Sequence, residues 1–177
     1  MIEGVTSDLE PRHVETFGEL YRYCYQVASV VGLTIIHIFG FDTRSALPLA
    51  EKCGVAFQLT NILRDIREDA ERGRIYIPAE DLRRFGVSED DLRGGNRSAA
   101  FLDLMRFEAA RARSYYKESA PLLDLVHPRS RSSLWALISI YSRLLERIEG
   151  TNYDVFSQRV RLSLFEKSWI VVRAMVG

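Results

Sequence analysis

Apolar residues recur at intervals of three and four along most of this chain, which is the spacing of one face of an α-helix. One such stripe runs through residues 14–39, and Gly40 is suited to ending that helix. The same pattern recurs at 42–69, 98–119, 128–149 and 157–176, with a short helical stretch at 81–85. Alternating patterns typical of strands are scarce. We therefore predict an all-α bundle that forms a single domain over residues 1–177.

The charge balance excludes one large class of partner. The chain has 24 Lys+Arg and 24 Asp+Glu residues, so its formal net charge is zero. Nucleic-acid-binding domains are usually basic overall or carry a dense stripe of Lys and Arg, and this sequence has no such stripe. We expect no binding to nucleic acid.

Cysteine usage and hydropathy together predict a cellular location. Cys24 and Cys53 lie far apart, without partners at metal-binding or redox spacing, so we expect neither a disulfide framework nor a zinc site. Residues 1–10 include acidic side chains and no apolar run, unlike a signal or transit peptide. No stretch reaches the roughly 18 uninterrupted apolar residues of a membrane span. These features predict a cytoplasmic protein, and they leave peripheral contact with a membrane open.

The candidate chemistry lies in residues 58–69. Residues four apart on an α-helix are one turn above each other, about 6 Å along the axis, so Asn61, Asp65 and Asp69 form one row of oxygen ligands. Mg²⁺ takes one or two carboxylates, keeps some of its waters and completes its coordination with phosphate oxygens of a substrate. We therefore expect Mg²⁺ at this row and a diphosphate as its ligand.

Arginines close to the row fit the same ligand. Arg64, Arg67 and Arg74 lie on the same helix or just after it, and a guanidinium group binds phosphate oxygens in a bidentate manner. The simpler alternative is a solvated helix face, with i, i+4 ion pairs worth about 0.2 to 0.5 kcal/mol each. Gln58 and Asn61 weigh against this alternative, because they interrupt an apolar run where a core would prefer Leu or Val.

Aromatic residues form a second candidate group. Tyr23, Phe57 and Tyr141 fall within three different predicted helices. An aromatic ring stabilises a carbocation through its quadrupole, and a phenol can hydrogen-bond a diphosphate or take part in proton movement. Core packing is the commoner role of a single tyrosine, so the residues alone leave both roles open.

Residues 23–32 (Tyr-Cys-Tyr-Gln-Val-Ala-Ser-Val-Val-Gly), 58–69 and 73–78 (Gly-Arg-Ile-Tyr-Ile-Pro) together resemble the squalene/phytoene synthase family. These head-to-head prenyl transferases join two prenyl diphosphates through a cyclopropyl intermediate. The resemblance covers nearly the whole chain and implies an isoprenoid-synthase-type helical bundle. It also implies an enzyme that condenses two farnesyl or geranylgeranyl diphosphates to squalene, presqualene diphosphate, dehydrosqualene or phytoene. NADPH is implied only if the product is squalene.

The resemblance also assigns roles to individual residues. Asn61, Asp65 and Asp69 match the family's second aspartate-rich motif, which holds Mg²⁺ bridging to the substrate diphosphate. Tyr23 and Tyr141 match functional tyrosines, so the implied catalytic residues are these two together with Asp65 and Asp69. The implied diphosphate-binding residues are Gln58, Arg64, Arg74 and Tyr76, with Arg159 as a weaker match. The implied lining of the tunnel for the prenyl tails is Ala28, Val31, Gly32, Gly54 and Phe57.

One feature of the family is missing from this sequence. Members carry a first motif, Asp-x-x-x-Asp, well before the tyrosine motif, but only residues 1–22 precede that motif here, and Asp8 with Glu10 cannot supply it. We therefore expect a bundle truncated at its N-terminus, with little or no synthase activity on its own and a separate N-terminal half as a partner. The alternative is a non-catalytic fragment that binds prenyl diphosphate or complements such a half.

Overall fold

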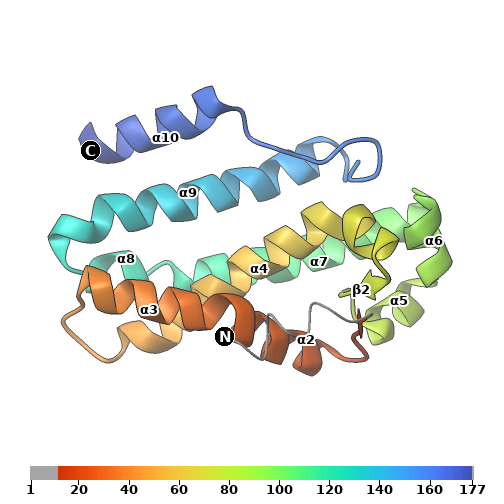
Figure 1. The fold of residues 1–177 in the computed structure, drawn as a ribbon, viewed down its shortest axis with the longest axis horizontal. Coiled ribbons are helices and arrows are strands. Elements are labelled where there is room, and N and C mark those ends of the chain that lie inside the picture. The colour runs from red at the N-terminus through yellow and green to blue at the C-terminus, as the bar shows by residue number, and fades with distance from the viewer. Residues whose placement is uncertain (1–11, 177) are drawn as a thin grey trace.

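The computed structural model describes residues 12–176 and confirms the all-α class. Asp8 and Glu10 lie outside the described residues. Long helices run side by side through the molecule, and α10 lies on the outer side of α9 (Figure 1). In chain order the elements are β1 (Arg12–His13), α2 (Phe17–Cys24), the π-helical segment η2 (Tyr25–Ser29), α3 (Val30–Phe39), α4 (Ala46–Glu71), β2 (Arg74–Ile75), α5 (Ala79–Phe85), α6 (Glu89–Gly94), α7 (Ala99–Ser119), α8 (Leu122–Leu125), α9 (Pro128–Gly150) and α10 (Leu164–Val176).

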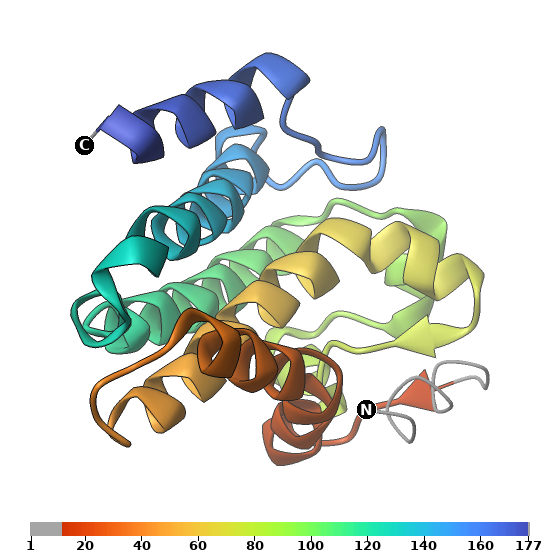
Figure 2. The ribbon, with the colours of Figure 1, turned by 60° about the vertical axis from the view of Figure 1, so that its left-hand side comes forward.

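Helix α4 is the central element and carries most of the candidate site residues. Twelve of its 26 residues are buried, because η2, α3, α7 and α9 all pack against it. Figure 2 shows α4 lying between α3 on one side and α7 and α9 on the other. Gln58, Asn61 and Asp65 are only partly buried on this helix. The polar residues of the candidate site are thus held by the most enclosed helix of the bundle.

The helix predicted over residues 14–39 begins at Phe17 and is not continuous. A π-helical turn separates α2 from α3, in which the backbone N–H of Val30 donates to the carbonyl oxygen of Tyr25, five residues earlier. A π-turn inserts one extra residue and rotates the side chains that follow it. Ser29, at the end of the turn, is fully buried, and its Oγ donates to the carbonyl oxygen of Glu51 on α4 at 2.9 Å.

The last helix also begins later than predicted, at Leu164 instead of residue 157. Ser163 explains the start, because its Oγ accepts from the backbone N–H of Glu166 and its own N–H donates to the Glu166 carboxylate at 2.9 Å. This reciprocal pair is a capping box, which the Ser-x-x-Glu spacing encodes. Arg159 therefore lies in an irregular segment before the helix, not on it.

Four small elements were not predicted. Strands β1 and β2 form a two-residue parallel pair, with Arg12 opposite Arg74 and His13 opposite Ile75. Helices α6 and α8 are one or two turns long, too short for a periodic pattern to reveal. Of these, α8 contributes a wall of the candidate site.

Main-chain contacts fasten one end of the bundle. Gly40 ends α3 with φ of 77°, and its carbonyl oxygen accepts from the N–H of His127 at 2.9 Å. The Oγ of Ser130 donates to the carbonyl oxygen of Phe39 at 2.9 Å, and Phe41 forms an antiparallel bridge with Val126. The end of α3 is thereby tied to the end of α8 and the start of α9.

A buried charged cluster holds the opposite part of the bundle. A guanidinium nitrogen of Arg111 on α7 lies 2.8 Å from Asp81 Oδ2 on α5 and 2.8 Å from both carboxylate oxygens of Glu108. The same guanidinium lies over the ring of Phe17 on α2, 4.2 Å from its centroid. Burial raises the pKa of Glu108 to about 8, even though Arg111 attracts its charged form.

None of the helices in the described part of the chain is long and apolar enough to cross a membrane.

Small residues set the distance between α4 and the π-turn. A Cβ atom added at Gly54 would lie 2.6 Å from Ser29 Cα and 2.9 Å from Ser29 N, which no side-chain movement can relieve. A Cβ added at Gly32 would lie 3.4 Å from the carbonyl oxygen of Ala50. The backbone of α4 therefore touches that of the π-turn at Gly54, and α3 approaches α4 closely at Gly32.

We predict that Gly54→Ala destabilises the protein by about 1–3 kcal/mol, because overpacking at a backbone contact forces the helices apart. The matched control is Gly150→Ala at the end of α9, where an added Cβ meets no atom within 4 Å. Urea unfolding followed by circular dichroism measures both changes. Equal stability of the two variants would contradict the close approach described above.

Candidate active site

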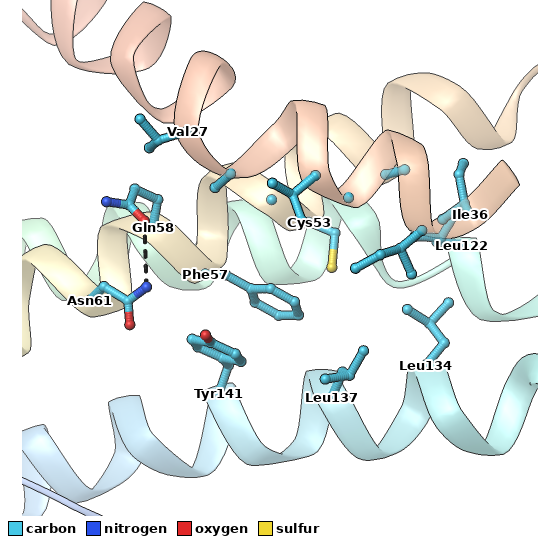
Figure 3. Close-up of a pocket in the computed structure, with 16 residues that line it drawn as sticks. Val27, Ile36, Cys53, Phe57, Gln58, Asn61, Leu122, Leu134, Leu137 and Tyr141 are labelled. Atoms are coloured by element: carbon cyan, nitrogen blue, oxygen red, sulfur yellow. Dashed lines mark hydrogen bonds between the residues drawn. The ribbon is translucent and has the colours of Figure 1, made fainter. Parts of the chain in front are cut away.

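A cavity of about 260 Å³ lies between η2 and α3, α4, α8 and α9 (Figure 3). Most of its lining is apolar. All five residues that were predicted to line a prenyl tunnel are found there, and so are three of the predicted polar or aromatic site residues. The eight are Ala28, Val31, Gly32, Gly54, Phe57, Gln58, Asn61 and Tyr141.

The cavity has a polar end and an apolar end. Gln58 and Asn61 form the polar end, where Asn61 Nδ2 donates to Gln58 Oε1 at 3.4 Å. Phe57 and Tyr141 stack between the two ends, with ring centroids 4.2 Å apart and an interplanar angle of 13°. Figure 3 shows this stack bridging α4 and α9, with aliphatic side chains beyond it. Such a cavity suits a ligand with a charged head and a hydrocarbon tail.

The three members of the predicted row lie in three different surroundings. Asn61 faces the cavity, whereas Asp69 lines a hollow of only about 10 Å³ with Arg74 and Tyr76. Asp65 lies between them on the helix and is paired with arginines. The row therefore begins at the polar end of the cavity and leads away from it along α4.

Asp65 is held by two guanidinium groups. Arg64 Nε donates to its Oδ1 at 2.8 Å, and Arg159 donates to both carboxylate oxygens, at 2.9 and 3.0 Å. Burial acts to raise the pKa of Asp65, but the hydrogen bonds from these arginines outweigh it and hold the pKa below its ordinary value. Asp65 is accordingly ionised at neutral pH, and it brings the weakly matched Arg159 to the row from a distant part of the chain.

Three further predicted residues, Tyr23, Tyr76 and Arg74, lie at or next to the small hollow that Asp69 lines. Tyr23 is 3% exposed and stacks on Tyr76, with ring centroids 4.7 Å apart. Tyr23 is therefore next to the hollow that Tyr76 shares with Asp69, and it is not among the residues that line the apolar cavity. Arg74 Nε is buried there, and of the buried side-chain nitrogen and oxygen atoms in the described residues it is the one without a hydrogen-bond partner. An unpaired guanidinium N–H is suited to a phosphate oxygen.

The donor set of the row suits Mg²⁺ better than a transition metal. Asn61, Asp65 and Asp69 offer one amide and two carboxylate groups at intervals of four residues, all of them hard oxygen ligands. Residues 12–176 contain no group of three or more His, Cys, Asp and Glu side chains placed to hold a metal ion. Mg²⁺ commonly completes such a set with waters and phosphate oxygens.

A second hollow, of about 400 Å³, was missed by the sequence analysis. Arg64, Arg159, Arg161 and Lys167 line it with several aliphatic residues, and Tyr141 is shared between this hollow and the apolar cavity. Arg161 and Lys167 come from the segment before α10 and from α10 itself, some 95 residues or more along the chain from Arg64. Only the fold brings these four cationic residues together beside the row.

Comparisons with known proteins identify the relatives of this chain. A family model described as squalene/phytoene synthase matches residues 1–166. The 15-cis-phytoene synthase of Synechocystis sp. is 42% identical over 171 residues, which cover 90% of this chain and 51% of that protein. The phytoene synthase of Arthrospira platensis is 39% identical over 180 residues, covering 94% of this chain and 58% of that protein.

Two solved structures show the same fold. The crystal structure of a dehydrosqualene synthase in complex with ligand matches with a TM-score of 0.89 and 31% identity, over 98% of this chain and 61% of the other. The squalene synthase HpnC from Alicyclobacillus acidocaldarius matches with a TM-score of 0.81 and 29% identity, over 86% and 58%. The chain spans about half the length of the curated relatives, at 51% and 58% for the two phytoene synthases above.

We predict that Arg159→Gln strengthens binding of Mg²⁺ alone by up to about fivefold, since a partly exposed ion pair is worth up to about 1 kcal/mol. The reason is that Arg159 occupies both oxygens of Asp65. The matched control is Arg161→Gln, which removes the same charge from the same hollow, whereas the hydrogen bonds to Asp65 come from Arg64 and Arg159. Isothermal titration calorimetry measures both affinities, and an equal gain in the two variants would contradict this competition.

Proposed function

Because the chain belongs to the squalene/phytoene synthase family, we propose that it forms part of an enzyme that condenses two prenyl diphosphates head to head. The observation that carries the proposal is the meeting of a polar row and an apolar cavity on one helix. Asn61 lines the cavity, and Asp65 and Asp69 follow it at successive turns of α4. A prenyl diphosphate has the same division into a charged head and an apolar tail.

In this proposal the hydrocarbon tail lies in the cavity and the diphosphate lies at the row. Gln58 and Tyr141 are at the junction, where they can donate hydrogen bonds to the first phosphate oxygens. Cationic groups surround the rest of the diphosphate: Arg64, Arg74 and Arg159, together with Arg161 and Lys167 of the second hollow. These groups offset the charge that develops on the departing diphosphate.

We further propose Mg²⁺ as the cofactor, held by Asn61, Asp65 and Asp69. When bound, Mg²⁺ supplies charge neutralisation at the diphosphate oxygens. Arg159 then has a second partner available, because its guanidinium can move from Asp65 to a phosphate oxygen.

The apolar lining determines the fate of the allylic cation that remains after diphosphate departs. Phe57 and Tyr141 present ring faces in the middle of the cavity, where they stabilise positive charge. The aliphatic walls exclude water, which would otherwise convert the cation to an alcohol. The double bond of the second substrate then attacks the cation. The proton lost from the coupled product goes to the bound diphosphate. Tyr23 is proposed to assist this step through Tyr76, on which its ring stacks beside Asp69, because Tyr23 itself does not line the cavity.

We propose that a separate N-terminal half, or the corresponding part of a longer chain, completes the bundle. In the dehydrosqualene synthase structure, 39% of the chain has no counterpart here. Helix α10 contacts α9 and presents a row of exposed apolar side chains that such a part can cover. They are Leu164, Phe165, Trp169, Val172 and Met175. Peripheral contact of this helix with a membrane surface is the competing proposal for the same side chains.

The test is a Mg²⁺-dependent assay with labelled farnesyl and geranylgeranyl diphosphates, run with this chain alone and with the remaining part of the family fold supplied as a second polypeptide. We expect a C30 or C40 hydrocarbon, or presqualene diphosphate, in the combined reaction, and NADPH dependence only for squalene. Asp65→Ala should reduce the rate at least about 100-fold, as loss of a group that stabilises the transition state does.

The matched control is Glu71→Ala on the same helix, an exposed acidic residue that pairs with Arg67 and lies off the row. Product formation that survives Asp65→Ala would contradict the proposed role of the row. Binding of prenyl diphosphate without product in any combination would instead support the non-catalytic alternative.

A further inference from the structure

The apolar end of the cavity is closed by three aliphatic side chains from three elements. Ile36 on α3, Leu122 on α8 and Leu134 on α9 line it, and they are only 2%, 1% and 4% exposed. Figure 3 shows them grouped at the end opposite Gln58 and Asn61. The cavity therefore stops at this group of residues, which we call the end wall.

The end wall belongs to a separate hydrophobic cluster that also contains Ala50, Cys53 and Val126. Its position is fixed by the main-chain contacts described above, among them the hydrogen bond of 2.9 Å from the N–H of His127 to the carbonyl oxygen of Gly40 and the bridge between Phe41 and Val126. These contacts join the last residues of α3 to α8 and α9. A tail that reached the end wall would have to break them in order to extend further.

The opposite end of the cavity fixes the head of the ligand. Gln58 and Asn61 are on α4, and so is Ala50, which lines the cavity near the end wall. Ala50 and Asn61 are eleven positions apart, which corresponds to about 16 Å along the helix axis. A head held at Asn61 thus leaves a tail of limited length between the Phe57–Tyr141 stack and the end wall.

We propose that Ile36, Leu122 and Leu134 determine which prenyl chain length this cavity accepts. This inference rests on the proposed function, because it assumes that a prenyl tail occupies the cavity. Leu134 belongs to α9, which also supplies Leu137 and Tyr141 to the lining. Shortening its side chain opens the cavity along the direction of the tail without touching the polar end.

The experiment compares Leu134→Ala with Leu145→Ala. Both leucines are buried on α9, but Leu145 belongs to the other hydrophobic cluster and does not line the cavity. The probes are farnesol and geranylgeraniol, measured by calorimetry with the full chain, and then the corresponding diphosphates. The alcohols report on the tail cavity without any requirement for Mg²⁺ or chemistry.

We expect Leu134→Ala to raise the ratio of the affinity for geranylgeraniol to the affinity for farnesol by about tenfold. This is the lower end of the discrimination that one methylene group produces in a hydrophobic pocket. Leu145→Ala should leave the ratio within twofold of that of the unmodified protein. Thermal unfolding verifies that each variant folds. Leu134→Val, which removes one carbon atom, gives a smaller shift in the same direction if the alanine variant does not fold.

An unchanged ratio in both Leu134 variants, or an equal change in Leu145→Ala, would overturn the assignment of the end wall. Failure of the proposed function gives a different result. In that case the alcohol ratio shifts as expected, but neither diphosphate binds more tightly than its alcohol in Mg²⁺.

Discussion

Contact between the backbones of η2 and α4 at Gly54 fixes the position of the site, because the cavity wall and the polar row both depend on it. Gly54 and Ser29 meet at a distance that allows no side chain on α4, and Gly32 lies close to Ala50 one turn further on. Three small residues, Ala28, Gly32 and Gly54, therefore form part of the cavity lining where these helices meet. Larger residues here would separate η2 and α3 from α4 and would change the width of the cavity along its whole length.

The same helix then determines where charge can lie. Its buried side is mostly apolar, and Arg64 lies where α4 faces α9 and the segment before α10. Asp65 is retained as an ion there because two arginines hydrogen-bond to it, although its burial favours the neutral form. Burying an unpaired carboxylate would be costly, so the arginines stabilise the fold as well as the site. A diphosphate with its cation can replace these pairs, since it offers Arg64 and Arg159 an anion and offers Asp65 a cation.

Much of the fold and part of the site could be predicted from the sequence. Helical periodicity predicted the long helices, and spacing by four residues placed Asn61, Asp65 and Asp69 on one face of α4. Periodicity could not reveal the π-turn, because one extra residue shifts the apolar stripe without ending it. It also could not reveal α8, whose single turn supplies Leu122 to the end wall.

Contacts between distant parts of the chain were beyond the reach of sequence spacing. Arg159 meets Asp65 across 94 residues, and Arg161 and Lys167 join the same hollow from the segment before α10 and its first turns. Tyr23 was expected beside the cation, but its ring lies against Tyr76, near Asp69. The capping box at Ser163 and Glu166 was readable in the sequence and would have placed the start of α10 correctly.

We propose that the row on α4 and the cavity beside it form one site for a prenyl diphosphate. The decisive experiment is a crystal structure of this chain with Mg²⁺ and a non-reactive thiolo analogue of farnesyl diphosphate. We expect the tail between the Phe57–Tyr141 stack and Leu134, with the diphosphate within hydrogen-bond distance of Gln58 and the metal beside Asp65. A tail bound on the exposed face of α10, or a diphosphate away from α4, would contradict it.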